Sequence, residues 1–134
     1  MNVVASIVGT TGTILAGDLL WLTLRQAYHK QLFQEVQGSP LQLRWLPAIP
    51  VYALLVFALY FVAVQPARRW QDAAALGATV GAVMYGFYDF TNYSTLTRWT
   101  LFMTLTDMAW GSFIGCIAAV VGFASRSIPK LVAM

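Results

Sequence analysis

The sequence predicts an all-α polytopic membrane protein, a bundle of four transmembrane helices with an interfacial amphipathic segment after the first helix. Of the 134 residues, 59% are hydrophobic and only 10% are charged, whereas soluble domains carry about 25% charged residues. Four apolar segments are each close to the ~20 residues needed to cross a bilayer core. Because this length is typical of one domain, we expect residues 1–134 to form a single four-helix unit.

The four predicted spans have approximate bounds of 3–24, 45–64, 73–93 and 101–124. The first lacks a basic N-terminal region and is longer than the apolar part of a signal peptide, so we expect it to be retained as a helix. The second carries Pro47 and Pro50 in its first turns, where a missing N–H group disturbs a helix least. It contains no charge, and we expect it to be the helix most exposed to lipid.

The connection over residues 25–44 is the longest between two spans. Its apolar residues Tyr28, Leu32, Phe33 and Val36 recur at helical spacing, with polar residues between them. We therefore expect an amphipathic helix that lies in the membrane interface and stops at the Gly-Ser-Pro sequence of residues 38–40. A solvated helical linker is the alternative interpretation.

The formal net charge of +3 indicates contact with lipid rather than with nucleic acid. All eight Lys and Arg residues lie outside the predicted spans, where they suit anionic headgroups, so the lipid bilayer is the expected partner. No soluble face interleaves aromatic and basic residues for base stacking. Four bases fall on each side of the predicted membrane, so the positive-inside rule gives no orientation. An ordinary protein with weak bias and a dual-topology antiparallel dimer both have this balance.

Three of the five acidic residues, Asp18, Asp89 and Asp107, lie within predicted spans. A carboxylate at the centre of a membrane helix costs roughly 2.5–3.5 kcal/mol on insertion scales, and such residues usually have a function. The first and third helices run in one direction and the fourth runs back. At 1.5 Å per residue, all three carboxyl groups then lie roughly 10 Å inside the same membrane face. We therefore predict that they form one site.

The third span places further polar side chains near Asp89. Tyr85 and Tyr93 lie four residues before and after it, and Asn92 lies three residues after it, so all share one side of the helix. We expect these three side chains to orient Asp89. The same span carries glycines at an interval of four residues, which is typical of close helix packing.

The pattern Asp-x-x-Trp occurs twice, at Asp18–Trp21 and at Asp107–Trp110. The two copies lie on helices predicted to run in opposite directions, which is consistent with a trace of an internal inverted repeat. Chance explains two such short matches almost as well. We predict that both tryptophans close the pocket or hold a cationic ligand against the face of the ring.

Three words of the sequence resemble a known family: Gly17-Asp18-Leu19-Leu20-Trp21, Tyr88-Asp89-Phe90-Thr91-Asn92, and Asp107-Met108-Ala109-Trp110-Gly111. The chain resembles a bacterial family of small predicted membrane proteins with four helices and no established activity, and the similarity covers nearly the whole sequence. The resemblance implies a multi-pass protein of the bacterial inner membrane. It implies no catalytic or binding residues.

Four interpretations of the aspartates remain open. The first is a small proton-coupled transporter of a cation or polar solute, with a proton shared between carboxylates and a homo-oligomer completing the pathway. The second is an accessory or assembly subunit of a larger membrane complex. A lipid-modifying enzyme is the least favoured, because the chain has no His cluster, nucleophile elbow or Asp-x-x-Asp motif. In the fourth, the carboxyl groups only fix helix register. We expect no metal and no cofactor, since His29 is the only histidine.

Overall fold

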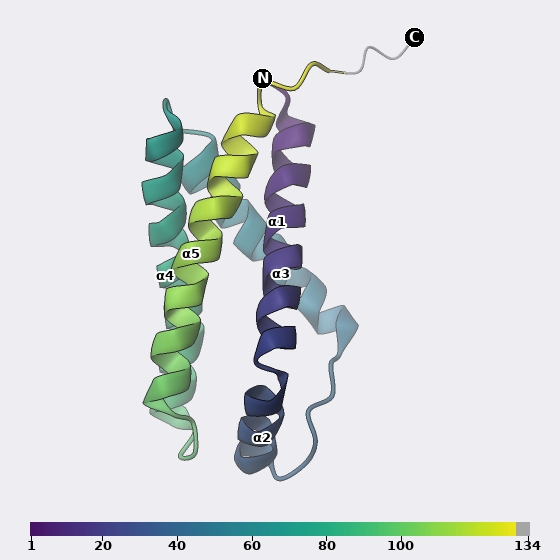
Figure 1. The fold of residues 1–134 in the computed structure, drawn as a ribbon, viewed down its shortest axis with the longest axis vertical. Helices are drawn as coiled ribbons and strands as arrows, with labels where there is room; N and C mark the ends of the chain where they lie inside the picture. Colours follow the sequence, from purple (N-terminus) through teal and green to yellow (C-terminus); the bar gives the residue numbers. More distant parts are fainter. Residues whose placement is uncertain (131–134) are drawn as a thin grey trace.

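The computed structural model describes residues 1–130 and is helical throughout its regular elements. In chain order these are α1 (Val3–Leu24), α2 (Gln26–Gln37), α3 (Trp45–Ala58), the π-helical turn η1 (Leu59–Val64), α4 (Trp70–Thr95) and α5 (Leu101–Ser125). Helices α1, α4 and α5 stand roughly side by side, and α3 crosses behind them (Figure 1). The short helix α2 lies at the end of the bundle opposite the N-terminus.

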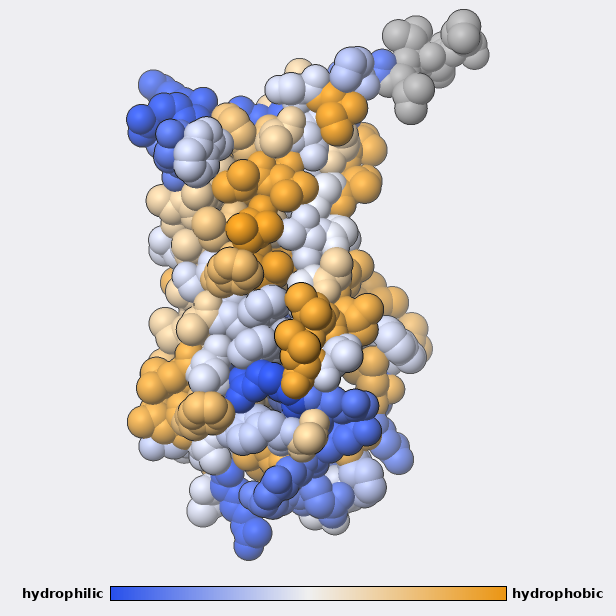
Figure 2. Space-filling view, viewed as in Figure 1, coloured by the Kyte–Doolittle hydropathy of each residue, from blue (hydrophilic) through white to orange (hydrophobic). Residues whose placement is uncertain are grey.

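Within residues 1–130, three helical segments are long and apolar enough to cross a membrane: Val3–Leu24, Trp45–Val64 and Leu101–Ser125. Three of the four predicted spans thus meet this criterion. Helix α4 does not, although it is 26 residues long, since its apolar residues alternate with Gly, Thr, Tyr and Asp. In Figure 2, hydrophobic residues cover much of the middle of the face in view, and hydrophilic residues gather at its two ends.

Side chains before the first turn define where two of the long helices begin. The Asn2 side chain accepts a hydrogen bond from the backbone N–H of Ala5 at 3.0 Å, which caps α1. Thr100 caps α5 in the same way by accepting from the N–H of Met103 at 3.0 Å. The backbone N–H of Asn2 also donates to the carbonyl of Arg126 at 2.9 Å, which joins the start of α1 to the end of α5.

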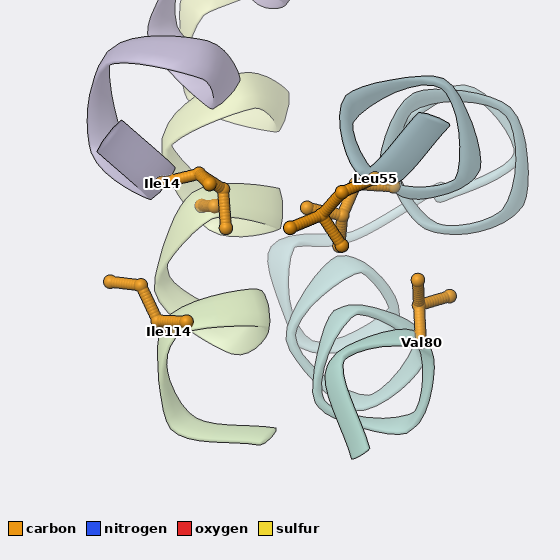
Figure 3. Close-up of a cluster of buried hydrophobic side chains, with 6 residues drawn as sticks. Ile14, Leu55, Val80 and Ile114 are labelled. Carbon is orange, nitrogen blue, oxygen red and sulfur yellow. The ribbon is translucent and has the colours of Figure 1, made fainter. Parts of the chain in front are cut away.

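The main hydrophobic core lies where the four long helical segments meet. Ile14 of α1, Leu55 of α3, Val80 of α4 and Ile114 of α5 are each at most 7% exposed. Their side chains converge between the helices (Figure 3). Burying each aliphatic side chain of this kind is worth about 1.5–3 kcal/mol relative to exposure to water. The core therefore fixes the four helices relative to one another.

Helices α4 and α5 make the closest contact in the bundle, because glycines face each other along it. A side-chain carbon at Gly81 would collide with the backbone carbonyl of Gly111, and one at Gly77 would collide with that of Gly115. The interval of four residues seen in the sequence thus corresponds to a real interface. Small residues at such an interface let two backbones approach closely.

The second predicted span changes its helical geometry part-way along. In η1 the chain winds more widely, and the N–H of Gln65 donates to the carbonyl of Tyr60 at 2.7 Å. The guanidinium of Arg126 donates to the carbonyl of Val64, the last residue of this turn, at 2.7 Å, and to that of Ala67 at 3.2 Å. The expectation that this span is the most lipid-exposed is wrong, because Val3–Leu24 has a smaller share of buried residues than Trp45–Val64. In the second span only Leu55 of α3 is buried, but four residues of η1 are.

The connection between the first two spans contains the predicted amphipathic helix. Helix α2 follows α1 after a single non-helical residue, Arg25, and ends at Gly38 with a left-handed φ of 72°. Its apolar side packs on the protein. The contact is a small cluster of Leu32, Trp99 and Met103, with Tyr28, Phe33 and Val36 packed against it. Helix α2 therefore covers the start of α5.

We predict that Gly81→Ala destabilises the fold by about 1–3 kcal/mol, because the added methyl group forces α4 and α5 apart. Gly12→Ala is the matched control: it also lies within a helix, but an added carbon there meets no atom within 4 Å. The control should be neutral or slightly stabilising. Unfolding in mixed detergent micelles, followed by circular dichroism, measures the difference. Equal stability of the two variants would contradict the close contact.

Candidate functional site

Two reciprocal hydrogen bonds join α1 to α5 at the centre of the site. The indole N–H of Trp21 donates to Asp107 Oδ1 at 2.8 Å, and that of Trp110 donates to Asp18 Oδ1 at 3.2 Å. Between them the two indole rings stack, with centroids 4.8 Å apart and planes 8° from parallel. Each Asp-x-x-Trp copy therefore uses its tryptophan to bind the aspartate of the other copy.

The spacing of the pattern explains this exchange. A residue three positions along a helix lies about one turn away on a similar face. Because α1 and α5 run in opposite directions, the turn that follows Asp18 lies beside Asp107, and the turn that follows Asp107 lies beside Asp18. A carboxylate in an apolar bundle needs a donor from a neighbouring helix, and the indole N–H supplies it without adding a charge.

Asp18 is the best-satisfied carboxyl group of the three. It is 9% exposed and accepts from donors on three other helices. Tyr85 of α4 donates to both oxygens, at 2.8 and 2.9 Å, and Tyr52 of α3 donates to Oδ2 at 2.9 Å. Trp110 supplies the third donor. Asp18 thus ties α1 to α3, α4 and α5.

Asp89 has the opposite environment. It is completely buried, and among the described residues neither of its oxygens has a hydrogen-bond donor. The carboxyl group of Asp107, on α5, is its acidic neighbour. Two carboxyl groups can form a hydrogen bond only when one of them carries a proton. Asp89 therefore lacks a donor unless one of the two carboxyl groups carries a proton.

Arg25 lies over the site at its α2 end. Its guanidinium stacks on Trp21, 4.6 Å from the ring centroid, and on Tyr28 at 4.8 Å. It also donates to the Thr106 hydroxyl at 2.8 Å. It forms no ion pair with an aspartate, and the only salt bridge within residues 1–130 is the exposed Arg69–Asp72 pair. A cation held by aromatic faces thus already occurs beside the carboxyl groups.

Two cavities adjoin the carboxyl groups. One, of about 240 Å³, reaches toward α2, and its wall includes His29, Phe33 and Trp99. The other, of about 340 Å³, lies between α3 and α4. Five residues line both: Asp18, Tyr52, Tyr85, Tyr88 and Asp107. Asp89 lines neither of these two cavities.

The predicted site residues divide into those that meet and those that do not. The three aspartates and both tryptophans form one cluster. Tyr85 belongs to it but donates to Asp18, so the expectation that it orients Asp89 is wrong. Asn92 and Tyr93 likewise donate no hydrogen bond to Asp89, and Tyr93 is 44% exposed.

Sequence reasoning missed Tyr52, Tyr88, Trp99 and Arg25 as neighbours of the cluster. Tyr52 offered one signal, because it is a polar side chain within an otherwise uncharged span. Arg25 was assigned only to the membrane surface, yet its long side chain lies on the aromatic rings of the site. Among residues 1–130, no group of three His, Cys, Asp or Glu side chains is arranged to hold a metal ion.

A known family matches the chain over residues 3–124, and it is described as "Predicted membrane protein (DUF2177)". The chain belongs to this family. The match includes the whole cluster and nearly all of the four long helical segments, so the chain is a membrane protein in contact with lipid. The family carries no established function, and neither a curated protein nor a solved structure matches the chain.

For this DUF2177 member we predict that Trp21→Phe lowers stability more than Trp110→Phe. Both changes keep an aromatic ring in the stack. Trp110→Phe leaves Asp18 with two tyrosine donors, whereas Trp21→Phe removes the indole donor of Asp107. An unsatisfied buried acceptor costs about 1–3 kcal/mol. Unfolding in detergent compares the two variants, and the reverse order would contradict the assignment of donors.

We further predict that α2 is held less firmly at acidic pH. His29 is 4% exposed, and burial lowers its pKa below the ordinary value of 6.5. The hydrogen bond to the backbone carbonyl of Arg25 and the charge of Asp107 oppose this shift, whereas the charge of Arg25 acts in the same direction. The detached state then binds more protons, so attachment is unaffected above about pH 6.5 and weakens as the pH falls through and below it. Hydrogen exchange of α2 at pH 5 and pH 8, corrected for intrinsic rates, measures this. The pH dependence should vanish in His29→Gln.

Proposed function

We propose that this protein is a proton-coupled transporter that exchanges an organic cation for a proton at the carboxyl cluster. The observation that carries the proposal is Asp89, which is fully buried without a donor beside Asp107, a carboxyl group that lines both cavities. A purely structural carboxyl group would be satisfied in the way that Asp18 is. A pair left to share a proton at the wall of a cavity suits proton exchange.

The two members of the pair have different roles in this proposal. Asp107 lines both cavities, so it can meet a ligand directly. Asp89 is fully buried and lines neither cavity, and in this proposal it exchanges protons through Asp107. A cation that binds at Asp107 takes the place of the shared proton, because one compact site does not hold both positive charges. The released proton and the bound cation then move in opposite directions.

The lining of the cavities favours a cation over other ligands. Asp18 and Asp107 supply negative charge, while Trp21, Tyr52, Tyr85 and Tyr88 supply aromatic or phenolic surface. Aromatic faces attract organic ammonium ions, and the attraction is about 2 kcal/mol or more where water is excluded. The guanidinium of Arg25 on Trp21 is an internal example of such a contact.

This function requires α4 to be the fourth membrane crossing, which we also propose. Its 26 residues extend about 39 Å, enough for a hydrocarbon core of ~30 Å. It runs antiparallel to α5, which is itself apolar enough to cross. Its polar residue Asp89 is turned inward, away from lipid. Assembly as a homo-oligomer or within a larger complex, and location in the bacterial inner membrane, stay predictions.

We predict that Asp107→Asn lowers cation-driven proton flux at least tenfold. The assay uses proteoliposomes with a trapped pH dye and an imposed gradient of tetramethylammonium. The matched control is Glu35→Gln, since Glu35 is exposed and is bonded only to Gln31 of the same helix. Asp89→Asn should still bind the cation but lose the response to a pH gradient. Unchanged proton flux in Asp107→Asn would contradict proton-coupled transport.

A further inference from the structure

We propose that the cation is an amphipathic amine that reaches the carboxyl groups sideways from the bilayer, through an opening between α3 and α4. This inference rests on the proposed function and specifies its substrate class. The ammonium group would lie at Asp18 and Asp107. The hydrocarbon tail would lie along the apolar residues at the opening.

The 340 Å³ cavity combines the two chemistries that such a ligand needs. Asp18 and Asp107 line it together with three tyrosines, and so do the apolar side chains of Val51, Leu55 and Met84. None of the residues that line this cavity is Lys, Arg or His. An anionic ligand would therefore find no counter-charge in it, whereas an ammonium ion would find two carboxyl groups.

The position of the cavity directs its opening toward lipid. Val51 is 61% exposed and Tyr88 is 53% exposed, and they stand on the two helices that border the cavity. Val51 belongs to the segment Trp45–Val64, which is apolar and long enough to span a membrane. Exposed side chains within a spanning helix contact lipid chains. A molecule already dissolved in the bilayer can thus reach the cavity without first crossing the headgroups.

Unsatisfied polar atoms indicate that the site is more than an acidic cluster. Both carboxyl oxygens of Asp89 lack a donor although the residue is fully buried. The indole N–H of Trp99 also lacks a partner, and Trp99, 3% exposed, lines the adjoining 240 Å³ cavity. Buried polar groups in native proteins are rarely left unpaired, and exceptions point to a ligand, ion or water. Trp99 therefore lines the 240 Å³ cavity with an unused donor, and Asp89 follows Tyr88, which lines both cavities.

The size of the cavity restricts the ligand to a single short chain. At about 340 Å³ it lies at the lower end of the range for small-molecule pockets, roughly 300–1,000 Å³. A two-chain lipid would have to leave most of its tails outside. Each methylene removed from water strengthens binding by about fourfold. A tail of moderate length should therefore raise the affinity, and comparing ligands with and without such a tail tests whether the tail lies in the opening between α3 and α4.

The test compares tetramethylammonium with octyltrimethylammonium in calorimetric titrations of the purified protein in one detergent. Val51→Trp narrows the opening, and Leu54→Trp is the matched control because Leu54 is 63% exposed on the same helix but does not line the cavity. We expect Val51→Trp to weaken octyltrimethylammonium at least tenfold and to leave tetramethylammonium within twofold. The control should change neither affinity. Retained tetramethylammonium binding also shows that the variant is folded.

The possible outcomes separate this inference from the proposed function. If wild-type protein binds both ions and Val51→Trp matches the control, or weakens both ions equally, the sideways route is wrong and the cation site stands. If neither ion binds wild-type protein, the cation site and the route are both wrong. If both bind but Asp107→Asn binds them equally well, the carboxyl cluster is not the site.

Discussion

The arrangement of the helices depends on satisfying a carboxyl group within an apolar bundle. Asp18 cannot find a donor on its own helix or in lipid, so its partners come from Tyr52, Tyr85 and Trp110. These three side chains represent the other three long helices. The hydrogen bonds of this one acidic residue thus fix which face each neighbouring helix turns toward α1. The hydrophobic core beside it stabilises the contact between the helices but does not specify these orientations.

The two ends of the bundle differ because of how closely the helices approach. From the main core toward the termini, glycines bring the backbones of α4 and α5 into contact and leave little space between them. Toward α2, bulky aromatic side chains replace the glycines and keep the helices apart, so cavities remain among them. The carboxyl groups lie at this transition.

Much of the fold follows from the sequence, since apolar length and helix direction determine which residues lie at one depth. The meeting of three aspartates could be deduced in this way. The rotation of each helix about its own axis could not be deduced from the sequence. Tyr85 and Asp89 are four residues apart, which leaves them about 40° apart around the axis. That difference sends Tyr85 to α1 and Asp89 to α5.

The fate of α2 shows a second limit of prediction. Its apolar face was evident from Tyr28, Leu32, Phe33 and Val36, but periodicity says only that a face is buried and not what covers it. The same apolar pattern would be expected whether lipid or the side chain of Trp99 covered this face, and the structure has Trp99 there. The roles of the aspartates were open for a similar reason. The sequence does not show that Asp18 has donors on three helices whereas Asp89 has none among the described residues.

The π-helical turn η1 determines how α3 is rotated about its own axis relative to the other helices. Arg126 fixes the chain at the last residue of this turn, and the turn determines the angle at which α3 leaves it. Removing a single residue from Leu59–Val64 would turn α3 by about 100° about its axis. Tyr52 would then point away from Asp18, although every helix would remain intact. The number of residues in this short segment therefore determines whether Tyr52, two turns away, faces Asp18. It also limits which insertions and deletions the chain can tolerate there.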